Sequence, residues 1–459
     1  MILNQIAKFK NNFAISNKSE QITYYELVNH VKNLIKLLRK KNIKSKDLIA
    51  VEIEDSHFFI IAALACIEGG YSFLPINYKM SNFEKKKIID FSKPRLILKI
   101  KNKKYILKKL KNISKNFKKQ ICVFFTSGTT AFPKGVCHTP QNLIKNAKKF
   151  NQTVKVKQKQ NFLHLFPMYY MAGFLNSIIC PLIAGNKIVI FDKSSLSNYI
   201  NFWDEIAKNK INYFWASPSI INIIQIQRIS LNLLKEVQKE LNFIMVGTAP
   251  FHEQLKKKFK KKFNIKCLES YGSSEMLLVS TNLINKSFGS GKILNGIKIK
   301  KDRKKNLLIS SPFKFFGYLK KNRSIEINKD KYFNSGDTFE KRDKFLKIIG
   351  RTKEIIIKEG INISPKHIED EFLKIKFIDE AGVIGIKHSL YGEVPVAFVK
   401  LNKKIDTDYI IKNLKKKLSE KLIPEEIIFV DEIPKNRIGK IDKNKLKKKY
   451  DNRPRSFKS

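Results

Sequence analysis

The sequence predicts an α/β fold, and two observations carry this prediction. Short apolar runs alternate with helical periodicity between residues 22 and 77, which is typical of helices layered on a mainly parallel sheet. The same alternation returns later, because the apolar run 121–125 leads into a glycine- and hydroxyl-rich loop and then into a helix start. At 459 residues, the chain is long enough for two or three domains with cores of their own.

The elements before the loop are predicted from the spacing of apolar residues. Apolar residues at helical spacing from Val28 to Leu38 predict an amphipathic helix. Residues 47–52 predict a short strand, and the continuous apolar run 58–67 predicts a buried helix. The stretch 99–120 is rich in Lys and poor in apolar residues, so it predicts an exposed linker or short helix.

The loop that begins at Thr126 has the composition of an anion-binding site. Its small and hydroxylic residues leave backbone N–H groups free to form a concavity, and the hydroxyls add further donors. Lys134 adds a compact positive charge, and Thr139 with Pro140 predicts an N-cap and the first position of a helix. The predicted ligand is a polyphosphate. The loop is not a Walker A loop, because no Gly-Lys-Ser/Thr ends it.

Three segments beyond the loop complete the prediction. The apolar run 243–246 predicts a buried strand, and it leads into a turn of small residues at 247–250. Apolar residues at every fourth position between 254 and 266, with Lys between them, predict a surface helix with one buried stripe. The basic tail from Lys443 is expected to be frayed.

Composition narrows the class of protein. The net charge of +51 first suggests a nucleic-acid partner. However, Lys is spread over nearly every segment and Arg, which phosphate and base readers favour, is scarce, so we do not expect nucleic-acid binding. The 5 cysteines stand far apart without a Cys-x-x-Cys pair, which implies neither a disulfide framework nor a zinc site. No apolar run approaches the roughly 20 residues of a membrane span, and the expected location is a reducing cytoplasm.

Five segments together resemble one family. Residues 126–136 resemble the phosphate-binding loop of the adenylate-forming superfamily, which includes acyl-CoA synthetases, luciferases and the adenylation domains of peptide synthetases. Residues 271–275 are similar to its Tyr-Gly-x-Thr-Glu motif, and 335–337 to its Thr-Gly-Asp motif. Residues 350–357 resemble its domain junction, and 434–441 its Pro-Lys-Thr-x-Ser-Gly-Lys-Ile motif. Because these motifs occur in family order over nearly the full length, the chain is identified as a member.

The resemblance implies two domains. A large N-terminal domain of layered sheets and helices, residues 1–352, would bind AMP and the acid. A small mobile α+β domain, residues 353–459, would carry the catalytic lysine, and Lys353 would be the hinge.

The resemblance also implies the site residues and the cofactors ATP, Mg²⁺ and CoA. Tyr271 would stack on adenine, Ser274 would meet the α-phosphate and Asp337 would bind the ribose hydroxyls. The ATP-binding positions are Thr126, Ser127, Gly128, Thr129, Thr130, Lys134, Gly247, Thr248, Ala249, Tyr271, Gly272, Ser273, Ser274, Asp337 and Arg351. The catalytic positions are Lys440, Thr130 and Glu275, with Glu275 also the metal ligand. The remaining positions are Tyr170, Gly173 and Ser217 in the acyl pocket and Gly360 in the CoA tunnel.

The chain departs from the family pattern at several positions. Ala131 and Glu359 stand where Gly is usual, Tyr170 where His is common, and Ile438 where Ser is common.

The implied activity is that of an AMP-forming acyl-CoA synthetase, which activates a carboxylic acid as its adenylate and then forms a thioester with CoA. The alternatives are a stand-alone enzyme that loads the phosphopantetheine of a carrier protein, an amino-acid-activating relative and a catalytically silent binding protein. No carrier domain is fused and no amino-group-binding Phe-Asp element is evident at 167–173, which favours free CoA. The presence of Lys134, Glu275 and Lys440 disfavours a silent protein.

Overall fold

The computed structural model describes residues 1–110, 117–126, 133–192, 199–248, 251, 253–284, 286, 288–303, 306–351, 356–363, 365–403, 405–434 and 441–453. The chain divides into two compact units. The first comprises Met1–Tyr78, Ile89–Phe125 and Gly135–Thr352, and the second Lys79–Ile88, Thr126–Lys134 and Lys353–Ser459. The functional division at residues 352 and 353 stays a prediction.

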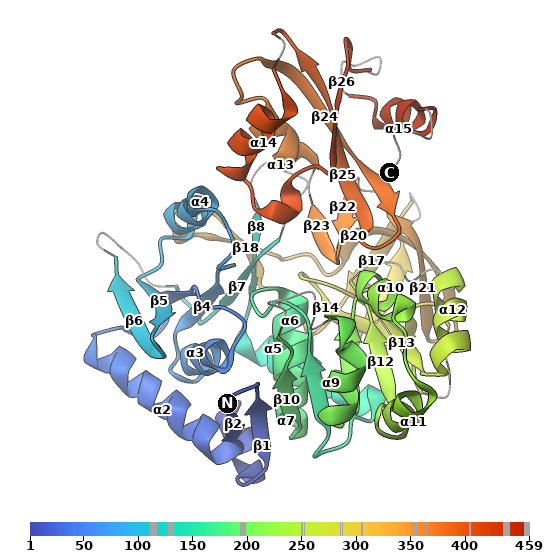
Figure 1. Ribbon diagram of the computed structural model, residues 1–459. Coiled ribbons are helices and arrows are strands. Elements are labelled where there is room, and N and C mark those ends of the chain that lie inside the picture. Colours follow the sequence, from blue (N-terminus) through green and yellow to red (C-terminus); the bar gives the residue numbers. More distant parts are fainter. Residues whose placement is uncertain are drawn as a thin grey trace. The chain divides into compact units, whose positions relative to one another are not determined.

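The first unit contains a thirteen-stranded sheet (Figure 1). In spatial order its strands are β16 (Lys298–Lys301), β17 (Asn306–Ser310), β20 (Phe333–Arg342), β21 (Phe345–Arg351), β15 (Gly291–Ile293), β14 (Leu277–Thr281), β13 (Cys267–Ser273), β12 (Phe243–Val246), β11 (Tyr213–Ala216), β9 (Asn161–His164), β10 (Lys187–Ile190), β1 (Phe13–Ser16) and β2 (Gln21–Thr23). The strands from β13 to β1 are parallel, whereas those from β13 to β16 are antiparallel. The predicted α/β fold with parallel sheet is confirmed, with an antiparallel half added.

An eight-stranded sheet carries the strands on either side of the glycine-rich loop. Its spatial order is β19 (Ile325–Ile327), β18 (Gly317–Leu319), β8 (Lys134–His138), β7 (Cys122–Thr126), β4 (Ser72–Pro75), β3 (Leu48–Val51), β5 (Leu96–Lys101) and β6 (Lys104–Lys109). The strands β7, β4, β3 and β5 are parallel, and β18 pairs antiparallel with β8.

The helices before residue 353 are mostly short. They are α1 (Leu3–Ile6), α2 (Tyr24–Lys40), α3 (His57–Glu68), α4 (Asn82–Ser92), α5 (Pro140–Val154), α6 (Met171–Phe174), α7 (Cys180–Ala184), α9 (Phe202–Lys208), α10 (Pro218–Ile226), α11 (Leu231–Glu240) and α12 (Glu253–Phe263), with 3-10 turns η1 (Ala7–Phe9) and η3 (Lys321–Arg323) and a π-helical turn η2 (Leu175–Ile179). No helix among the described residues is long and apolar enough to cross a bilayer.

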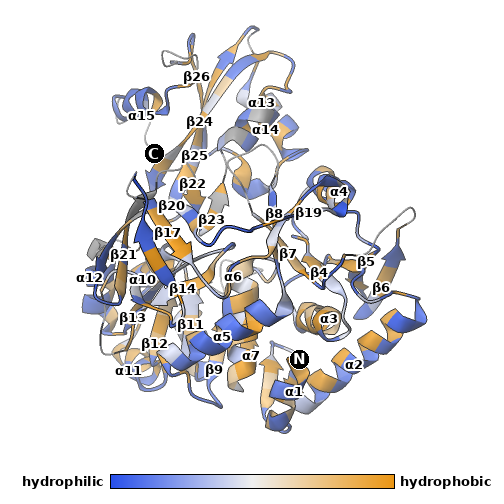
Figure 2. Cartoon of the chain, turned by 180° about the vertical axis from the view of Figure 1, so that it is seen from behind, coloured by the Kyte–Doolittle hydropathy of each residue, from blue (hydrophilic) through white to orange (hydrophobic). Residues whose placement is uncertain are grey.

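The predicted helices α2, α3, α5 and α12 are confirmed. Thr23 begins α2 with a capping box, since its hydroxyl accepts from the Glu26 N–H and the Glu26 carboxylate accepts from the Thr23 N–H. The apolar stripe of α2 is buried, and its polar face is visible in Figure 2. The stripe packs on α3, which is apolar all round and almost wholly buried. Thr139 caps α5, with Pro140 in its first turn.

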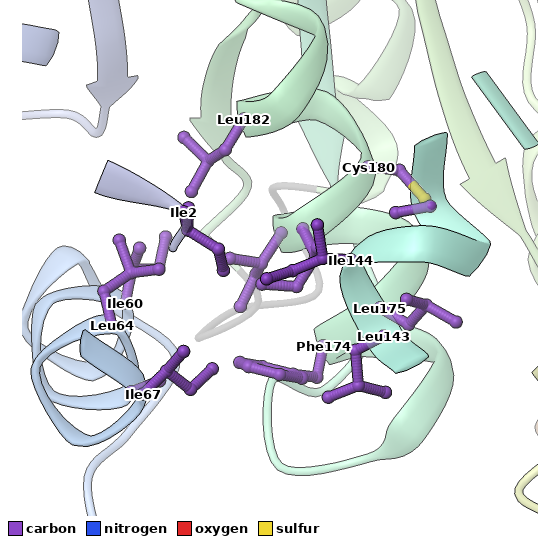
Figure 3. Close-up of a cluster of buried hydrophobic side chains, with 14 of the residues drawn as sticks. Ile2, Ile60, Leu64, Ile67, Leu143, Ile144, Phe174, Leu175, Cys180 and Leu182 are labelled. Carbon is purple, nitrogen blue, oxygen red and sulfur yellow. The ribbon is translucent and has the colours of Figure 1, made fainter. Parts of the chain in front are cut away.

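The core joins the two sheets through Phe174 of α6. Its ring centroid lies 5.2 Å from that of Phe73 and 5.4 Å from that of Phe124, both on the eight-stranded sheet. Figure 3 shows Phe174 facing Ile67 of α3, with Leu143 of α5 beside it. These contacts place both sheets in one close-packed hydrophobic core. The distance between side chains of one sheet and those of the other is therefore well defined.

The second unit packs helices on both faces of a small sheet. Its elements are β22 (Ile356–Lys358), β23 (Ile361–Ile363), α13 (Pro365–Phe372), β24 (Ile378–His388), β25 (Gly392–Leu401), α14 (Thr407–Lys415), η4 (Glu420–Leu422), β26 (Glu426–Phe429) and α15 (Lys443–Asp451). Because side chains alternate along a strand, Ala397 packs in the cluster of α13 and α14, whereas Phe398 packs with Leu446 of α15.

The linker or short helix expected at 99–120 is wrong for residues 99–109, which form part of a β-hairpin. Residues 96–109 form a hairpin of β5 and β6 with a two-residue turn, Asn102 and Lys103, whose φ angles are 49° and 58°. Tyr105 donates a hydrogen bond to the Phe58 carbonyl oxygen at 2.9 Å. The strand pattern is hidden in the sequence because Lys occupies most of the exposed positions.

The frayed tail expected from Lys443 is also wrong as far as residue 451. Asp442 caps α15 by accepting a hydrogen bond from the Lys445 N–H at 3.1 Å. Leu446 is fully buried, and Lys443 forms an ion pair with Glu369 at 3.0 Å. One buried leucine and one cap order a helix that is otherwise mostly Lys.

Candidate functional site

The hairpin of β13 and β14 carries residues 271–275. A Cβ added at Gly272 would lie 2.2 Å from the Leu277 carbonyl oxygen, so only glycine lets the two strands approach this closely. The Ser273 hydroxyl accepts a hydrogen bond from the Met276 N–H at 3.2 Å and closes the turn. The motif glycine therefore has a steric reason in this chain.

Tyr271 and Asp337 are in direct contact. The Tyr271 hydroxyl donates to the Asp337 Oδ2 atom at 2.5 Å, although the two residues are 66 positions apart. Asp337 is only 2% exposed, so its carboxylate needs hydrogen-bond donors. A carboxylate can accept several hydrogen bonds at once, which is the property for which Asp337 is predicted to bind ribose hydroxyls.

The segment before Asp337 fixes that residue from the backbone side. The Asn334 Oδ1 atom accepts from the Gly336 N–H at 2.9 Å, and Gly336 has a φ of 70°, which favours glycine. The Ser335 hydroxyl accepts from the Asp337 N–H at 3.1 Å and donates to the Leu307 carbonyl at 3.0 Å. The Ser-Gly-Asp residues thus form a turn that orients the carboxylate.

Glu275 is held from the neighbouring sheet. The Tyr318 hydroxyl donates to the Glu275 Oε1 atom at 3.0 Å, and the Phe315 N–H donates to the Glu275 carbonyl at 2.7 Å. Burial raises the pKa of Tyr318 well above its ordinary value, and the adjacent Glu275 carboxylate raises it further. Tyr318 therefore stays a protonated donor at neutral pH.

His138 binds the adjacent residue of the same turn. Its Nε2 atom lies 2.7 Å from the Ser274 carbonyl oxygen, and the imidazole is fully buried. Burial lowers the pKa of His138 to about 4, although the bond to Ser274 acts in the opposite direction. The ring is neutral at pH 7, and because a carbonyl only accepts, Nε2 carries the proton.

The turn after β12 contains Gly247 and Thr248. A Cβ at Gly247 would lie 3.2 Å from the Trp215 ring, and the Gly247 N–H donates to the Ala216 carbonyl at 3.2 Å. Thr248 has a φ of 72°, an unfavourable angle for a β-branched residue. Its buried Oγ1 atom has no hydrogen-bond partner among the residues that the structure describes. Ala249 lies outside the described residues.

The glycine-rich loop is described only at its two ends. The Thr126 hydroxyl lies 3.5 Å from the Lys134 carbonyl oxygen, and the Lys134 side chain is exposed. Both residues belong to the second unit. Ser127, Gly128, Thr129, Thr130 and the departure Ala131 lie outside the described residues. The phosphate-binding role of the loop stays a prediction.

The three predicted acyl-pocket residues have clear structural surroundings. Tyr170 occupies the position before α6, and a Cβ at Gly173 would lie 1.8 Å from the Pro167 carbonyl oxygen. Ser217 is 1% exposed and caps α10, because its hydroxyl accepts from the Ile220 N–H at 3.2 Å. Their contact with an acid stays a prediction.

The small-domain positions are described in part. Glu359 and Gly360 form the two-residue turn between β22 and β23, with φ angles of 51° and 78°. Glu359 also forms an ion pair with Lys421. The predicted hinge Lys353, the predicted catalytic Lys440 and the departure Ile438 lie outside the described residues, as does the side chain of Arg351.

The structure bonds Tyr271 to Asp337, and it bonds Glu275 and Ser274 to two residues that sequence reasoning missed, Tyr318 and His138. Tyr318 lies outside the five segments that carry the family resemblance. Nothing local marks His138, whose acceptor is 136 residues away.

Glu275 fits the magnesium that the family implies. The described residues contain no group of three or more His, Cys, Asp or Glu side chains able to hold a metal. Mg²⁺ does not require such a group, since it is usually bound by one or two carboxylates together with phosphate oxygens and water. Tyr318 uses one acceptor position of the Glu275 carboxylate and leaves the others available.

Comparisons with known proteins show which family the chain belongs to. The sequence matches the AMP-binding enzyme family over residues 2–123 and 118–309, and the AMP-binding enzyme C-terminal domain over residues 367–440. It is 24% identical to 2-succinylbenzoate–CoA ligase of Oceanobacillus iheyensis, covering 93% of this chain and 94% of that protein. It is 25% identical to long-chain-fatty-acid–CoA ligase of Mycobacterium tuberculosis, covering 72% of this chain and 67% of that protein.

The fold is similar to that of o-succinylbenzoate CoA synthetase from Bacillus subtilis, with a TM-score of 0.83 and 21% identity over 97% of this chain and 98% of that chain. The chain therefore belongs to the AMP-binding enzyme family, within the adenylate-forming superfamily, and is a ligase of the acyl-CoA synthetase type.

Proposed function

We propose that the protein uses ATP and Mg²⁺ to convert a carboxylic acid into its acyl-adenylate with release of pyrophosphate, and then transfers the acyl group to CoA with release of AMP. The observation that carries the proposal is the 2.5 Å hydrogen bond between Tyr271 and Asp337. Glu275 lies four residues after Tyr271, in the hairpin of β13 and β14. The residues that bind the adenine, the ribose and the metal ion of one nucleotide must lie this close together.

The nucleotide would be bound in three parts. The Tyr271 ring stacks on adenine, the Asp337 carboxylate accepts hydrogen bonds from the ribose hydroxyls, and the Ser274 hydroxyl donates to the α-phosphate. The buried Oγ1 of Thr248 adds a donor near the base. Glu275 holds Mg²⁺, which when bound neutralises phosphate charge.

Activation brings two anions together, because the substrate carboxylate must approach the α-phosphorus. Catalysis then consists chiefly of orientation and charge neutralisation. Lys134 and Lys440 are the cations proposed for this purpose, with Thr130 as a further phosphate donor. Lys440→Ala is expected to slow pyrophosphate release by about 10²–10³-fold, as when one preorganised donor is lost. Unchanged pyrophosphate release would refute the assignment.

CoA is the proposed acyl acceptor, and a carrier protein is the alternative. The two relatives described above are CoA ligases, which supports CoA. Gly360 is proposed in the tunnel for the thiol and Lys353 as the hinge between the two half-reactions. A reducing, cytoplasmic location is proposed as well, and it is supported by the 5 free cysteines.

The test is Mg²⁺-dependent exchange of labelled pyrophosphate into ATP, run across short, medium, branched and aromatic acids. The active acid is then incubated with either CoA or a carrier protein bearing phosphopantetheine, and AMP release is measured. We expect acid-dependent exchange and CoA-dependent AMP release. Absence of exchange with every acid would contradict the adenylation step, and AMP release with the carrier protein alone would replace CoA as the acceptor.

A further inference from the structure

Two side chains without an assigned role converge on the turn that carries Glu275. Tyr318 donates to the Glu275 carboxylate at 3.0 Å, and His138 donates to the Ser274 carbonyl at 2.7 Å. Both come from the eight-stranded sheet, on the paired strands β18 and β8, where Tyr318 lies opposite Val136. The turn itself belongs to the thirteen-stranded sheet.

Three hydrogen bonds in total restrain this turn. Together with the bond from the Phe315 N–H to the Glu275 carbonyl, the bonds from Tyr318 and His138 hold the backbone at residues 274 and 275 and one oxygen of the carboxylate. His138 is fully buried. If its N–H donor were removed, the Ser274 carbonyl would lose a hydrogen bond that water could not readily replace.

A restrained carboxylate should bind metal better than a mobile one. The free Glu275 side chain would have to be immobilised when Mg²⁺ binds, whereas the bond from Tyr318 fixes its orientation beforehand. Partners that orient a metal ligand in this way typically change metal affinity by about 10–100-fold.

We propose that Tyr318 and His138 are positioning residues for the metal site, which hold Glu275 in the orientation that binds Mg²⁺ with the nucleotide. The inference rests on the metal role of Glu275 stated under the proposed function. It concerns only where the carboxylate is held, and neither residue contacts the reacting groups.

The experiment measures Mn²⁺ affinity by electron paramagnetic resonance in the full-length protein saturated with α,β-methylene-ATP, so no turnover is required. Tyr318→Phe is expected to weaken Mn²⁺ binding by about 10–100-fold. His138→Leu should weaken it as well, and His138→Gln, which retains an N–H donor of similar reach, should restore most of the loss. Tyr105→Phe is the matched control, because it removes a partly buried hydroxyl, as Tyr318→Phe does, and this hydroxyl is bonded to the Phe58 carbonyl.

A second readout separates positioning from general loss of structure. In pyrophosphate exchange, Tyr318→Phe should raise the Mg²⁺ concentration for half-maximal rate while the KM for the acid stays unchanged. Thermal unfolding of each variant sets the temperature at which both measurements are made, below its midpoint. A rise in both constants together would overturn the positioning role.

Glu275→Gln separates the positioning role of Tyr318 and His138 from the metal-binding role of Glu275. If it weakens Mn²⁺ binding while Tyr318→Phe and His138→Leu match the Tyr105→Phe control, the positioning inference is wrong and the metal role stands. If Glu275→Gln itself leaves Mn²⁺ affinity unchanged, the metal role in the proposed function is wrong, and the inference fails with it.

Discussion

Two turns from family motifs are held in different ways. The turn at Glu275 depends on buried, long-range contacts, with Tyr318 and His138 bonded to it and Gly272 packed against the Leu277 carbonyl. The turn at Glu359 and Gly360 depends on positive φ angles and one partly exposed ion pair. The comparison teaches that a motif position set by local backbone angles tolerates a departure such as Glu359, whereas one set by close packing does not.

The largest expected effect is the contrast between Gly272→Ala and Gly360→Ala. The first places a Cβ 2.2 Å from a backbone oxygen, so the hairpin must shift, and we expect a loss of about 3 kcal/mol with adenylation reduced roughly 100-fold. The second strains a left-handed angle and should cost about 1–2 kcal/mol with little change in adenylation. Urea unfolding and pyrophosphate exchange measure both. Equal losses would remove the distinction between the two turns.

The pH dependence of stability should show the buried His138. Its pKa in the folded protein is lowered to about 4 from 6.5, so the unfolded chain takes up the proton first as the pH falls. This contribution is complete above pH 6.5 and is lost as the pH falls toward 4, by up to about 3 kcal/mol. Urea midpoints of wild type and His138→Gln at pH 7, 6, 5 and 4.5 test it. The variant should lose less stability over this range, and parallel curves would contradict the prediction.

Removal of the Tyr271 hydroxyl should affect both stability and nucleotide binding. Tyr271→Phe leaves a nearly buried carboxylate short of one donor, and we expect a loss of about 2 kcal/mol and a roughly tenfold higher KM for ATP. Tyr24→Phe is the control, since that hydroxyl is also buried but bonds the carbonyls of Leu182 and Asn186. The control should lose stability without a change in KM. A similar KM shift in both would argue against a nucleotide role for Tyr271.

The smallest effect is expected at Glu359. Glu359→Gly relieves a strain of about 1–2 kcal/mol but removes the ion pair with Lys421, which contributes about 0–1 kcal/mol at a partly exposed site. The net change should be a stabilisation of about 1 kcal/mol or less. Lys421→Met removes the ion pair alone and should be nearly neutral. Urea unfolding of both variants checks the difference, and a large destabilisation by Glu359→Gly would show that the turn is held by more than backbone angle.

Sequence reasoning succeeded where periodicity and caps are local. The helix α2 follows from its apolar stripe, and α3 from an uninterrupted apolar run. The β5–β6 hairpin and α15 were missed, because abundant Lys hides the alternation in the first and Leu446 is the sole buried residue of the second.

The site residues also divide into those that the sequence predicts and those that only the structure reveals. The motif residues Tyr271, Glu275 and Asp337 were found by resemblance, and the structure adds the contact between the first and last of them. His138 and Tyr318 could not be assigned from spacing, since their bonds to the turn depend on how two separate sheets meet.

The buried cysteines have a practical consequence for the acyl-transfer assay. Burial raises the pKa of Cys137 and Cys267 to about 12, and it raises the pKa of Cys66, Cys122 and Cys180 as well. Thiolates, which react with Ellman's reagent, are therefore scarce on the folded protein at pH 8. The coenzyme that remains can be titrated with that reagent in samples withdrawn from the reaction, against a protein background that stays low until the chain unfolds.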